Sequence, residues 1–409
     1  MSLMAMLMCS LGRANAWNDI YRISWTNMHD QLAELVPPLS EEMHKGQAGR
    51  IGVIGGSIEY TGAPYYAAMS ALRAGGDLTT VLCANEAAAP IKSYSPELMV
   101  RGIYTSHVGE ELDENREAET ETCSNNGICD TGIVEGEAMK GAGIVNKYIS
   151  RLHVLVLGPG LGRSGVALRI ASKVVPLAQS RSLPLVIDAD ALFMLTQGNN
   201  LDFIRGNHDV VLTPNRVEFE RLLTAADIAF SSCDVISEDG VEAAEMETSG
   251  TGGQEDGTAT ELGHRAMLAR RLANSLGGVT VLLKGRTDII TCGTRVIEVV
   301  ERGSPRRVGG QGDILAGILG VSLHWAKTSP RNAEGNRVTD FSEAQENSVK
   351  AAAFASILTR RSSALAYKQY RRAVSSIEIV NSIGEAFDVM IPADDTPCTC
   401  TGDVVESVK

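Results

Sequence analysis

The chain has 409 residues, of which 44% are hydrophobic and 21% are charged, so it can bury a sizeable core. Its formal net charge of -13 argues against a nucleic-acid-binding protein, which usually presents a basic face. Local loops of an acidic protein can still bind a phosphate compound. No stretch approaches the roughly 18 apolar residues expected of a membrane span, so we expect no membrane association.

The N-terminal residues give little support to a secretory signal. The run from Met1 to Leu11 is apolar, but no basic residue precedes it. Arg13 and Arg22 leave a mitochondrial presequence open. The eight cysteines are scattered without zinc-ligand spacing, which indicates free thiols in a reducing compartment. We therefore expect a cytoplasmic protein, with a mitochondrial location as the alternative.

From residue 51 onward, short apolar runs alternate with helical patterns. The runs are compact and rich in Val, Ile and Leu, as is typical of strands that are covered on both faces. The alternation predicts an α/β fold with a mainly parallel sheet. The predicted helices are Tyr65–Ala74 and Ile314–Ala326, and the predicted strands are Ile51–Ile54, Leu78–Cys83, His153–Leu157, Leu185–Ile187, Val210–Leu212 and Val279–Leu283.

The pattern predicts one domain over residues 31–392, with an N-terminal extension at 1–30 and a flexible tail at 393–409. Two stretches interrupt the apolar periodicity, near 109–143 and near 231–263. The first is acidic and contains several glycines, and the second is rich in Ser, Thr, Glu and Gly. This composition is typical of solvated, partly disordered insertions in loops.

Five of the predicted strands run directly into small or polar residues. In open α/β sheets, ligands bind beyond the carboxyl ends of the strands. One such loop alone is explained equally well by a turn, but five together predict a binding site along one edge of the sheet. The loops are Gly55-Gly56-Ser57, Gly158–Gly162, Asp188-Ala189-Asp190, Thr213-Pro214-Asn215 and Lys284-Gly285.

The strongest signal for chemistry is the segment from Gly303 to Asp313, which runs into an apolar helix. Its glycines let the backbone approach an anion closely, and the amides at a helix start point toward negative charge. This arrangement suits a phosphoryl group in transfer. Asp313 would face the same place and could accept a proton from an attacking hydroxyl. The alternative is that Asp313 only caps the helix.

Other polar residues in these loops have two readings each. Lys284 either reaches nucleotide phosphates or belongs to a simple turn. Glu218 either organises magnesium and water or only stabilises a helix start by its negative charge. Asp188 and Asp190 are either site residues or helix caps. The sequence has no Walker A segment, no Gly-x-Ser-x-Gly elbow and no complete Gly-x-Gly-x-x-Gly after the first predicted strand, which disfavours P-loop enzymes, serine hydrolases and Rossmann dehydrogenases.

An ordered set of short segments resembles one known family. The chain is similar to the ATP-dependent NAD(P)H-hydrate dehydratases of the ribokinase-like superfamily, over roughly residues 32–390 apart from the two insertions. The segments that carry the resemblance are Lys45–Arg50, Glu59–Pro64, Tyr94–Glu97, Gly158–Gly162, Asp188-Ala189-Asp190, Thr213-Pro214-Asn215 with Glu218-Phe219, Lys284-Gly285 and Gly309–Asp313.

The resemblance implies a ribokinase-like α/β fold and an ATP-dependent, magnesium-assisted repair of hydrated NADH and NADPH. It assigns Asp313 as the catalytic residue. It implies substrate contacts from Gly160, Gly162, Asn215, Arg216, Val217, Glu218, Phe219, Glu220, Arg221 and Asp313. It implies ATP contacts from Lys284, Gly285, Arg286, Thr287, Asp288, Gly303, Ser304, Pro305, Arg306, Arg307, Val308, Gly309, Gly310, Gln311 and Gly312.

The resemblance leaves the metal ligands open. The chain departs from the family pattern in its two insertions and at Val308, where close eukaryotic relatives are expected to have Cys. Since the chain lacks an epimerase domain, an NAD(P)H-hydrate epimerase on a separate chain is the expected functional partner, and a homo-oligomer is a further option. Two alternatives remain. One is a ribokinase-like small-molecule kinase, and the other is a nucleotide-binding protein without catalysis.

Overall fold

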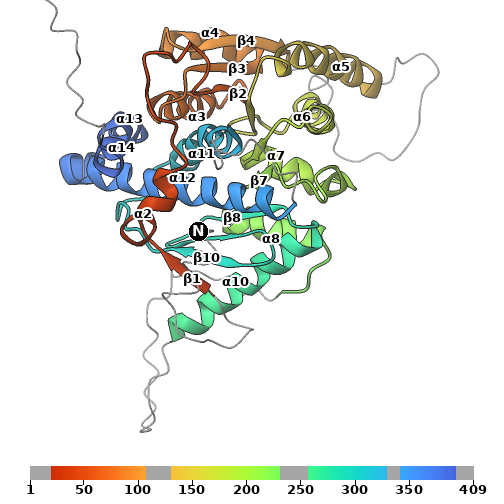
Figure 1. Ribbon diagram of the computed structural model, residues 1–409. Coiled ribbons are helices and arrows are strands. Elements are labelled where there is room, and N and C mark those ends of the chain that lie inside the picture. Colours follow the sequence, from red (N-terminus) through yellow and green to blue (C-terminus); the bar gives the residue numbers. More distant parts are fainter. Residues whose placement is uncertain (1–19, 107–129, 231–256, 329–340, 393–409) are drawn as a thin grey trace, which may run out of the picture.

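The computed structural model describes residues 20–106, 130–230, 257–328 and 341–392. Its centre is a 10-stranded sheet in the order β1-β10-β9-β8-β7-β6-β5-β2-β3-β4 (Figure 1). All strands are parallel except β9, which runs antiparallel to both of its neighbours. The strands are β1 (Ile20–Ile23), β2 (Arg50–Ile54), β3 (Leu78–Ala84), β4 (Met99–Tyr104), β5 (Val154–Leu157), β6 (Leu185–Ile187), β7 (Val210–Leu212), β8 (Thr280–Leu283), β9 (Asp288–Thr291) and β10 (Val296–Val299).

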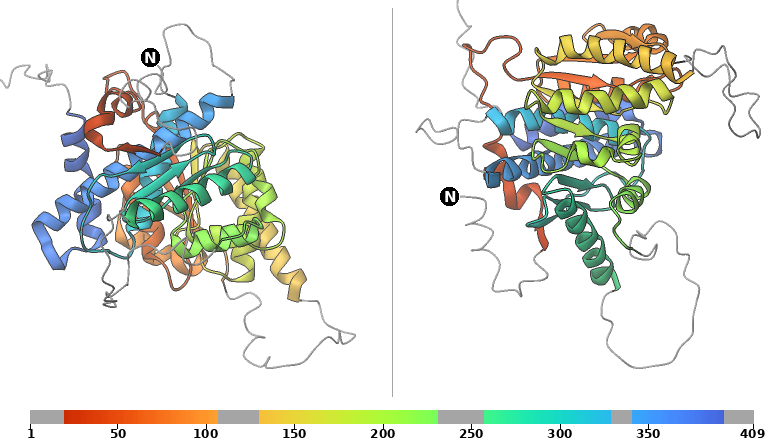
Figure 2. Two further views of the ribbon diagram at one scale, coloured as in Figure 1. Left: turned by 90° about the horizontal axis from the view of Figure 1, so that it is seen from below. Right: turned by 90° about the vertical axis from the view of Figure 1, so that its right-hand side faces the viewer.

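Helices cover both faces of the sheet. Helices α3, α4, α11 and α12 lie on one side, and α5, α6, α7, α8 and α10 lie on the other (Figure 2). The helices are α2 (Trp25–Ala33), α3 (Gly62–Arg73), α4 (Asn85–Tyr94), α5 (Asp130–Ile149), α6 (Gly165–Gln179), α7 (Ala189–Leu195), α8 (Arg216–Ala225), α10 (Gly257–Ser275), α11 (Gln311–Thr328), α12 (Phe341–Tyr370), α13 (Ser376–Asn381) and α14 (Ile383–Met390), with short 3-10 turns at Asn200–Phe203 and Arg371–Ala373.

The central strands are buried along their whole length. Every residue of β5, β6, β7 and β8 is buried, which explains why each of them is a continuous Val, Ile, Leu or Thr run. The predicted mainly parallel α/β fold is confirmed, and all six predicted strands are present with bounds that differ by at most one residue at each end. Strands β1, β4, β9 and β10 were not predicted.

Helix α11 brings the glycine-rich segment to the sheet. A Cβ on Gly317 would lie 2.0 Å from the carbonyl oxygen of Ala67, so this glycine lets α11 approach α3 at backbone distance. Ser70 of α3 strengthens the crossing, because its hydroxyl donates to the carbonyl oxygen of Ile314 at 3.1 Å. Gly320 makes room for the side chain of Val156 of β5, which would lie 2.9 Å from a Cβ at this position. This close packing against α3 and β5 fixes the position of α11 relative to the sheet.

The ordered structure extends into three stretches that the sequence analysis treated as peripheral. Residues 20–23 pair with β10 at the edge of the sheet, within the predicted extension. Helices α5 and α10 occupy the last parts of the two predicted insertions. In α5 the buried residues Ala138, Ala142, Val145 and Ile149 recur at helical spacing, a signal that the intervening glycines and glutamates obscured. The remainder of the insertions, residues 1–19 and the predicted tail at 393–409 lie outside the described residues.

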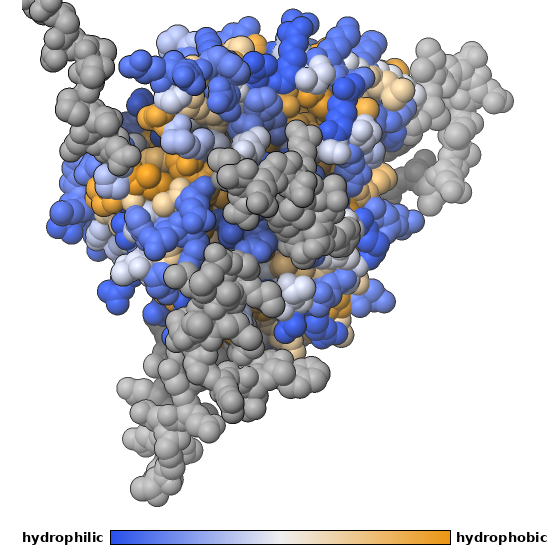
Figure 3. Space-filling model, in the orientation of Figure 1, coloured by the Kyte–Doolittle hydropathy of each residue, from blue (hydrophilic) through white to orange (hydrophobic). Residues whose placement is uncertain are grey.

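The surface hydropathy and the buried free cysteines are typical of a folded globular protein. Most of the face in Figure 3 is hydrophilic, with hydrophobic residues gathered in separate patches. In the described ranges we find no helix with the length and apolar character that crossing a bilayer requires. Cys83 and Cys292 are buried free thiols, and the other cysteines lie outside the described residues.

Candidate active site

The five polar loops predicted from the sequence meet at one edge of the sheet. They follow β2, β5, β6, β7 and β8, which are consecutive neighbours in the sheet and run parallel to one another. Their carboxyl ends therefore lie side by side. This part of the prediction is confirmed, and it places the candidate site where open α/β sheets bind their ligands.

Glycines allow three of these loops to pack backbone against backbone. A Cβ on Gly158 would lie 1.8 Å from the carbonyl oxygen of Asp188, and a Cβ on Gly55 would lie 2.0 Å from that of Pro159. Gly160 has a φ of +61°, and a Cβ there would lie 2.7 Å from the carbonyl oxygen of Tyr60. Any side chain at these positions would push the loops apart, so the floor of the site depends on glycine.

Asp190 fixes the loop that carries the predicted substrate glycines. Its carboxylate accepts a hydrogen bond from the amide of Gly162 at 3.0 Å and another from Nε of Arg163 at 3.1 Å. The Arg163 guanidinium also lies over the ring of Phe193, with 4.3 Å between Cζ and the ring centre, so a cation–π contact helps to hold this side chain. Asp190, in the first turn of α7, thus helps to position the Gly160–Gly162 loop.

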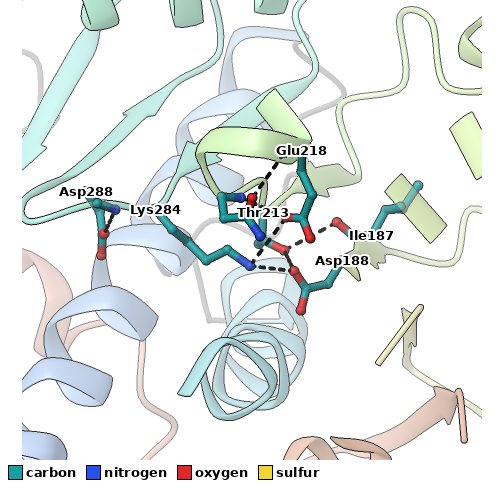
Figure 4. A network of polar contacts seen from close by, with 8 residues as sticks. Ile187, Asp188, Thr213, Glu218, Lys284 and Asp288 are labelled. Carbon is teal, nitrogen blue, oxygen red and sulfur yellow. Dashed lines mark hydrogen bonds and ion pairs between the residues drawn. The ribbon is translucent and has the colours of Figure 1, made fainter. Parts of the chain in front are cut away.

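A buried ion pair forms the centre of the site (Figure 4). Nζ of Lys284 lies 2.8 Å from Oδ1 of Asp188, and the hydroxyl of Thr213 donates to the same oxygen at 2.8 Å. Oε2 of Glu218 lies 3.9 Å from Nζ on the other side. Burial alone would lower the pKa of Lys284, but the charges of Asp188 and Glu218 raise it, so the ammonium stays protonated.

Asp188 stands at the start of α7 without capping it through its side chain. Its carboxylate turns to Lys284 instead, which settles the alternatives that the sequence left open for this residue in favour of a place in the polar network. The next residue, Ala189, has a φ of +48°, a left-handed conformation that is rare for alanine. Such local strain persists only where the surroundings hold it, and it is common at functional sites.

The predicted substrate contacts at the start of α8 lie in different environments. Asn215 and Glu218 form a reciprocal capping box, with bonds of 2.8 and 3.0 Å between side chains and amides. Glu218 is mostly buried, which raises its pKa. The remaining predicted contacts lie elsewhere: Val217 and Arg221 are exposed, Arg216 pairs with Glu220, and the ring of Phe219 is buried in the core.

The start of α11 lies directly beside Lys284. Nζ of Lys284 would be 3.3 Å from a Cβ built on Gly312, so the ammonium touches the first turn of the helix. The first amides of a helix have no acceptor within it and, with the helix dipole, attract anions. Gly310 has a φ of +90°, and Ser376 of α13 donates a hydrogen bond to the carbonyl of Gly309. Together these groups form a positively polarised cradle.

Asp313 lies in this first turn and faces the polar network. Burial and the negative charge of Asp188 raise the pKa of Asp313 to about 7, although Lys284 opposes the shift. A carboxyl group with a pKa near neutrality can take up and release a proton at physiological pH. The geometry therefore gives Asp313 a chemical capacity that a simple helix cap does not need.

The predicted nucleotide-contacting segments lie on either side of this cradle. Lys284 enters the site, whereas the carboxylate of Asp288 turns away toward α12. In the second segment, Ser304 is held by Ser363 of α12 through a bond of 3.1 Å. Residues 305–307 are exposed, and Gly309 is open to solvent. Backbone groups and exposed basic side chains of this segment are thus accessible to a ligand.

The residues present fit a nucleotide polyphosphate better than they fit a bare metal ion. Lys284 and the α11 amides supply positive charge, and the open space at Gly309 leaves room for a phosphate. Within the described ranges, no three His, Cys, Asp or Glu side chains are grouped so as to hold a metal. A magnesium ion would instead be held by phosphates and water with one or two carboxylates. Glu218 is suitably placed to contribute.

Sequence reasoning missed some of the residues that build this site. Thr213 was quoted only as part of a loop, and Tyr66, which packs over Gly310, was not considered. Arg360 of α12 was also missed, although it binds the Lys284–Asp288 loop. No local signal identifies Tyr66 or Arg360, because each acts on a segment more than 70 residues away in the chain.

The fold is that of the ribokinase-like α/β proteins, with the candidate site at the carboxyl ends of the strands. A ribokinase-like superfamily protein from Enterococcus faecalis superposes with a TM-score of 0.59 at 20% identity, covering 92% of this chain and 99% of that one. An ADP/ATP-dependent NAD(P)H-hydrate dehydratase from Bacillus subtilis, co-crystallised with ATP/Mg2+, gives 0.54 at 17% identity and covers 91% and 99%. At this identity the likeness shows the fold.

Sequence comparison identifies the family. The sequence model of NAD(P)H-hydrate dehydratase matches residues 51–384. The ATP-dependent (S)-NAD(P)H-hydrate dehydratase of Rattus norvegicus is 36% identical over 379 residues, which cover 92% of this chain and 88% of the rat protein. The protein of the same name from Aspergillus fumigatus is 40% identical, over 78% of this chain and 74% of its own length. The chain belongs to the NAD(P)H-hydrate dehydratase family.

Proposed function

We propose that this chain catalyses the ATP-dependent dehydration of the (S)-hydrates of NADH and NADPH, which restores the normal cofactors. The observation that carries the proposal is the position of Asp313, a carboxyl group of pKa about 7 in the first turn of α11, beside the Lys284 ammonium. Family membership supplies the substrate class. The same geometry would serve a ribokinase-like kinase, and the product of the reaction distinguishes the two.

Asp313 acts first as a general base. The hydroxyl on the hydrated ring is a poor leaving group, and ATP supplies the phosphoryl group that converts it into one that departs as phosphate. Asp313 takes the proton of this hydroxyl as its oxygen attacks the terminal phosphorus. The ring nitrogen then provides the electrons that expel phosphate, and loss of a proton from the adjacent ring carbon restores the double bond. The net reaction consumes one ATP for each cofactor repaired.

The neighbours of Asp313 stabilise the charge that develops on the transferring group. Lys284 and the amides at the start of α11 lie where negative charge accumulates, and fixed donors of this kind usually give the largest catalytic contribution. Asp188 holds Lys284 in place. We assign the ATP phosphates to Lys284 and Gly309–Gly312, and the hydrated ring to the side of Gly160, Gly162 and Glu218.

The proposal extends to partners and location. The chain handles one stereoisomer, so an NAD(P)H-hydrate epimerase on a separate chain would supply it from the other. A homo-oligomer is a further proposal. We propose a cytoplasmic location, with the mitochondrion as the alternative that Arg13 and Arg22 leave open.

The test is spectroscopic. Purified protein is mixed with hydrated NADH and magnesium, with and without ATP, and absorbance in the reduced-nicotinamide band is followed. The proposal predicts that absorbance returns only with ATP. A stable phosphorylated product without any gain in absorbance would contradict the dehydratase and favour the kinase.

A further inference from the structure

Arg360, in the middle of α12, makes five bonds with its guanidinium group. Nε donates to Oδ2 of Asp288 at 3.0 Å, and Nη2 pairs with Oδ1 of the same carboxylate at 2.7 Å. Nη2 also donates to the carbonyl of Gly285 at 2.9 Å. Nη1 donates to the carbonyls of Arg286 at 2.7 Å and Glu301 at 3.4 Å. A guanidinium has five N–H groups, so this set accounts for all of them.

These bonds join the two segments that we assign to the nucleotide. Gly285 and Arg286 directly follow Lys284 in the chain, and Glu301 stands two residues before Gly303, where the second segment starts. The carboxylate of Asp288 is fixed further by the amide of Gly285 at 2.9 Å and by the hydroxyl of Ser356 at 2.7 Å. Both loops are thereby attached to one side chain.

The same part of α12 provides a second attachment. Ser363, three residues after Arg360, accepts a hydrogen bond from the amide of Ser304 at 3.1 Å. The hydroxyl of Ser304 in turn accepts from the amide of Arg306 at 3.0 Å. The stretch from Ser356 to Ser363 therefore contacts the loop after β8 and the loop after β10 at once.

We propose that this part of α12, through Arg360, positions the nucleotide loops and so sets the affinity of the enzyme for ATP. The proposal rests on the proposed function for the identity of the nucleotide. Arg360 is a positioning residue, because its N–H groups are already used and none is left for a phosphate. Its effect is confined to the ATP side, since the glycines assigned to the hydrate lie in the loop after β5, where Asp190 accepts a hydrogen bond from the amide of Gly162.

Holding both loops requires an arginine at position 360 and not merely a positive charge. A lysine at position 360 would still neutralise Asp288. A single ammonium cannot reach the carboxylate and three separate carbonyls at the same time, because it lacks the planar fork of the guanidinium. Arg360→Lys thus separates charge balance, which it keeps, from loop positioning, which it loses.

The matched control is Arg270→Lys. Arg270 of α10 also donates from Nε to a backbone carbonyl, that of Gly293, at 2.9 Å. Gly293 follows β9, whereas Asp288 begins it, so the control removes a similar bond at the opposite end of the same strand.

The experiment measures KM for ATP, KM for hydrated NADH, kcat and the melting temperature of the full-length variants. Arg360→Lys should raise KM for ATP about tenfold, as expected when two hydrogen bonds are lost, with KM for the hydrate within about twofold of wild type. Arg270→Lys should leave both KM values unchanged. An unchanged KM for ATP in Arg360→Lys, or an equal rise of both KM values, would overturn the proposal.

Direct binding of ATP with magnesium, followed by titration calorimetry, keeps the test independent of the reaction. If wild type fails to restore reduced nicotinamide, the proposed function fails, while a weaker ATP affinity in Arg360→Lys still supports the positioning role. Should Arg360→Lys not fold, Ser363→Ala provides the test, with an expected loss of about threefold in ATP affinity. Wild-type affinity in Ser363→Ala would then refute the proposal.

Discussion

Lys284 and Asp188 lie face to face across the carboxyl ends of β8 and β6, with 2.8 Å between Nζ and Oδ1. Both also act on Asp313, in opposite directions. The negative charge of Asp188 raises the pKa of Asp313, and the positive charge of Lys284 lowers it. The pair therefore sets the pH at which Asp313 changes its protonation state, in addition to providing a cation for the phosphates.

A pH profile tests this relationship. As a general base, Asp313 must be deprotonated, so the rate should fall as the pH drops through about 7. Asp188→Asn removes a negative charge near Asp313 and leaves Lys284 with Glu218 as its ion-pair partner, and both effects lower the pKa of Asp313. We predict that the acid limb of the kcat profile moves to lower pH in Asp188→Asn. Asp209→Asn, which breaks only the exposed pair with Lys327, should keep the wild-type limb. An acid limb that is the same in all three proteins would contradict the role of Asp188.

Thermal stability gives a second, non-kinetic test of the same carboxyl group. The pKa of Asp313 rises from 3.8 to about 7 on folding, so the folded protein loses stability as the pH increases between these values. Asp313→Asn has no such titration. The variant should therefore melt above wild type by roughly 2 °C or more at pH 8, with the difference shrinking toward pH 4. A variant that is less stable than wild type at pH 8 would show that the carboxylate stabilises the fold as a cap.

Substitutions at the adjacent glycines Gly309 and Gly310 distinguish an effect on stability from an effect on ligand binding. A Cβ on Gly310 would lie 2.8 Å from the Ser376 hydroxyl and 2.9 Å from the Tyr66 ring, at a φ of +90°. A Cβ on Gly309 meets nothing within 4 Å. Gly310→Ala should lower the melting temperature by several degrees, and Gly309→Ala should not. If phosphates approach Gly309 as we propose, Gly309→Ala still weakens ATP binding about tenfold or more, measured by calorimetry. Normal ATP affinity in Gly309→Ala would place the phosphates elsewhere.

The sequence was sufficient for six of the ten strands and for the polar loops that follow five of them. Strands β5, β6 and β7 are buried on both faces, so their composition alone marks them. Since parallel neighbours end at the same edge, the polar residues that follow them had to meet. The antiparallel β9 and the edge strand β1 were missed. Along the chain, the alternation between apolar runs and helical patterns marks the central strands, and this alternation is less clear around β9 and β1.

The side-chain contacts within the site were not predictable in the same way. Asp188 had two equally good interpretations until its carboxylate was seen to face Lys284, 96 residues away in the chain. Asp288 belongs to a predicted ATP segment, yet its side chain binds Arg360. Phe219 is part of a predicted substrate segment, yet its ring is fully buried. Side-chain direction depends on tertiary neighbours, which local sequence patterns do not encode.

The central claim is that Asp313 drives an ATP-consuming dehydration. The most direct measurement follows reduced nicotinamide regained and ADP and phosphate released in one reaction, for wild type and Asp313→Asn. The account predicts equal amounts of all three products from wild type. It predicts a loss of about 1000-fold or more in rate for Asp313→Asn, with ATP binding kept. Undiminished recovery in Asp313→Asn, or recovery in wild type without ADP release, would contradict it.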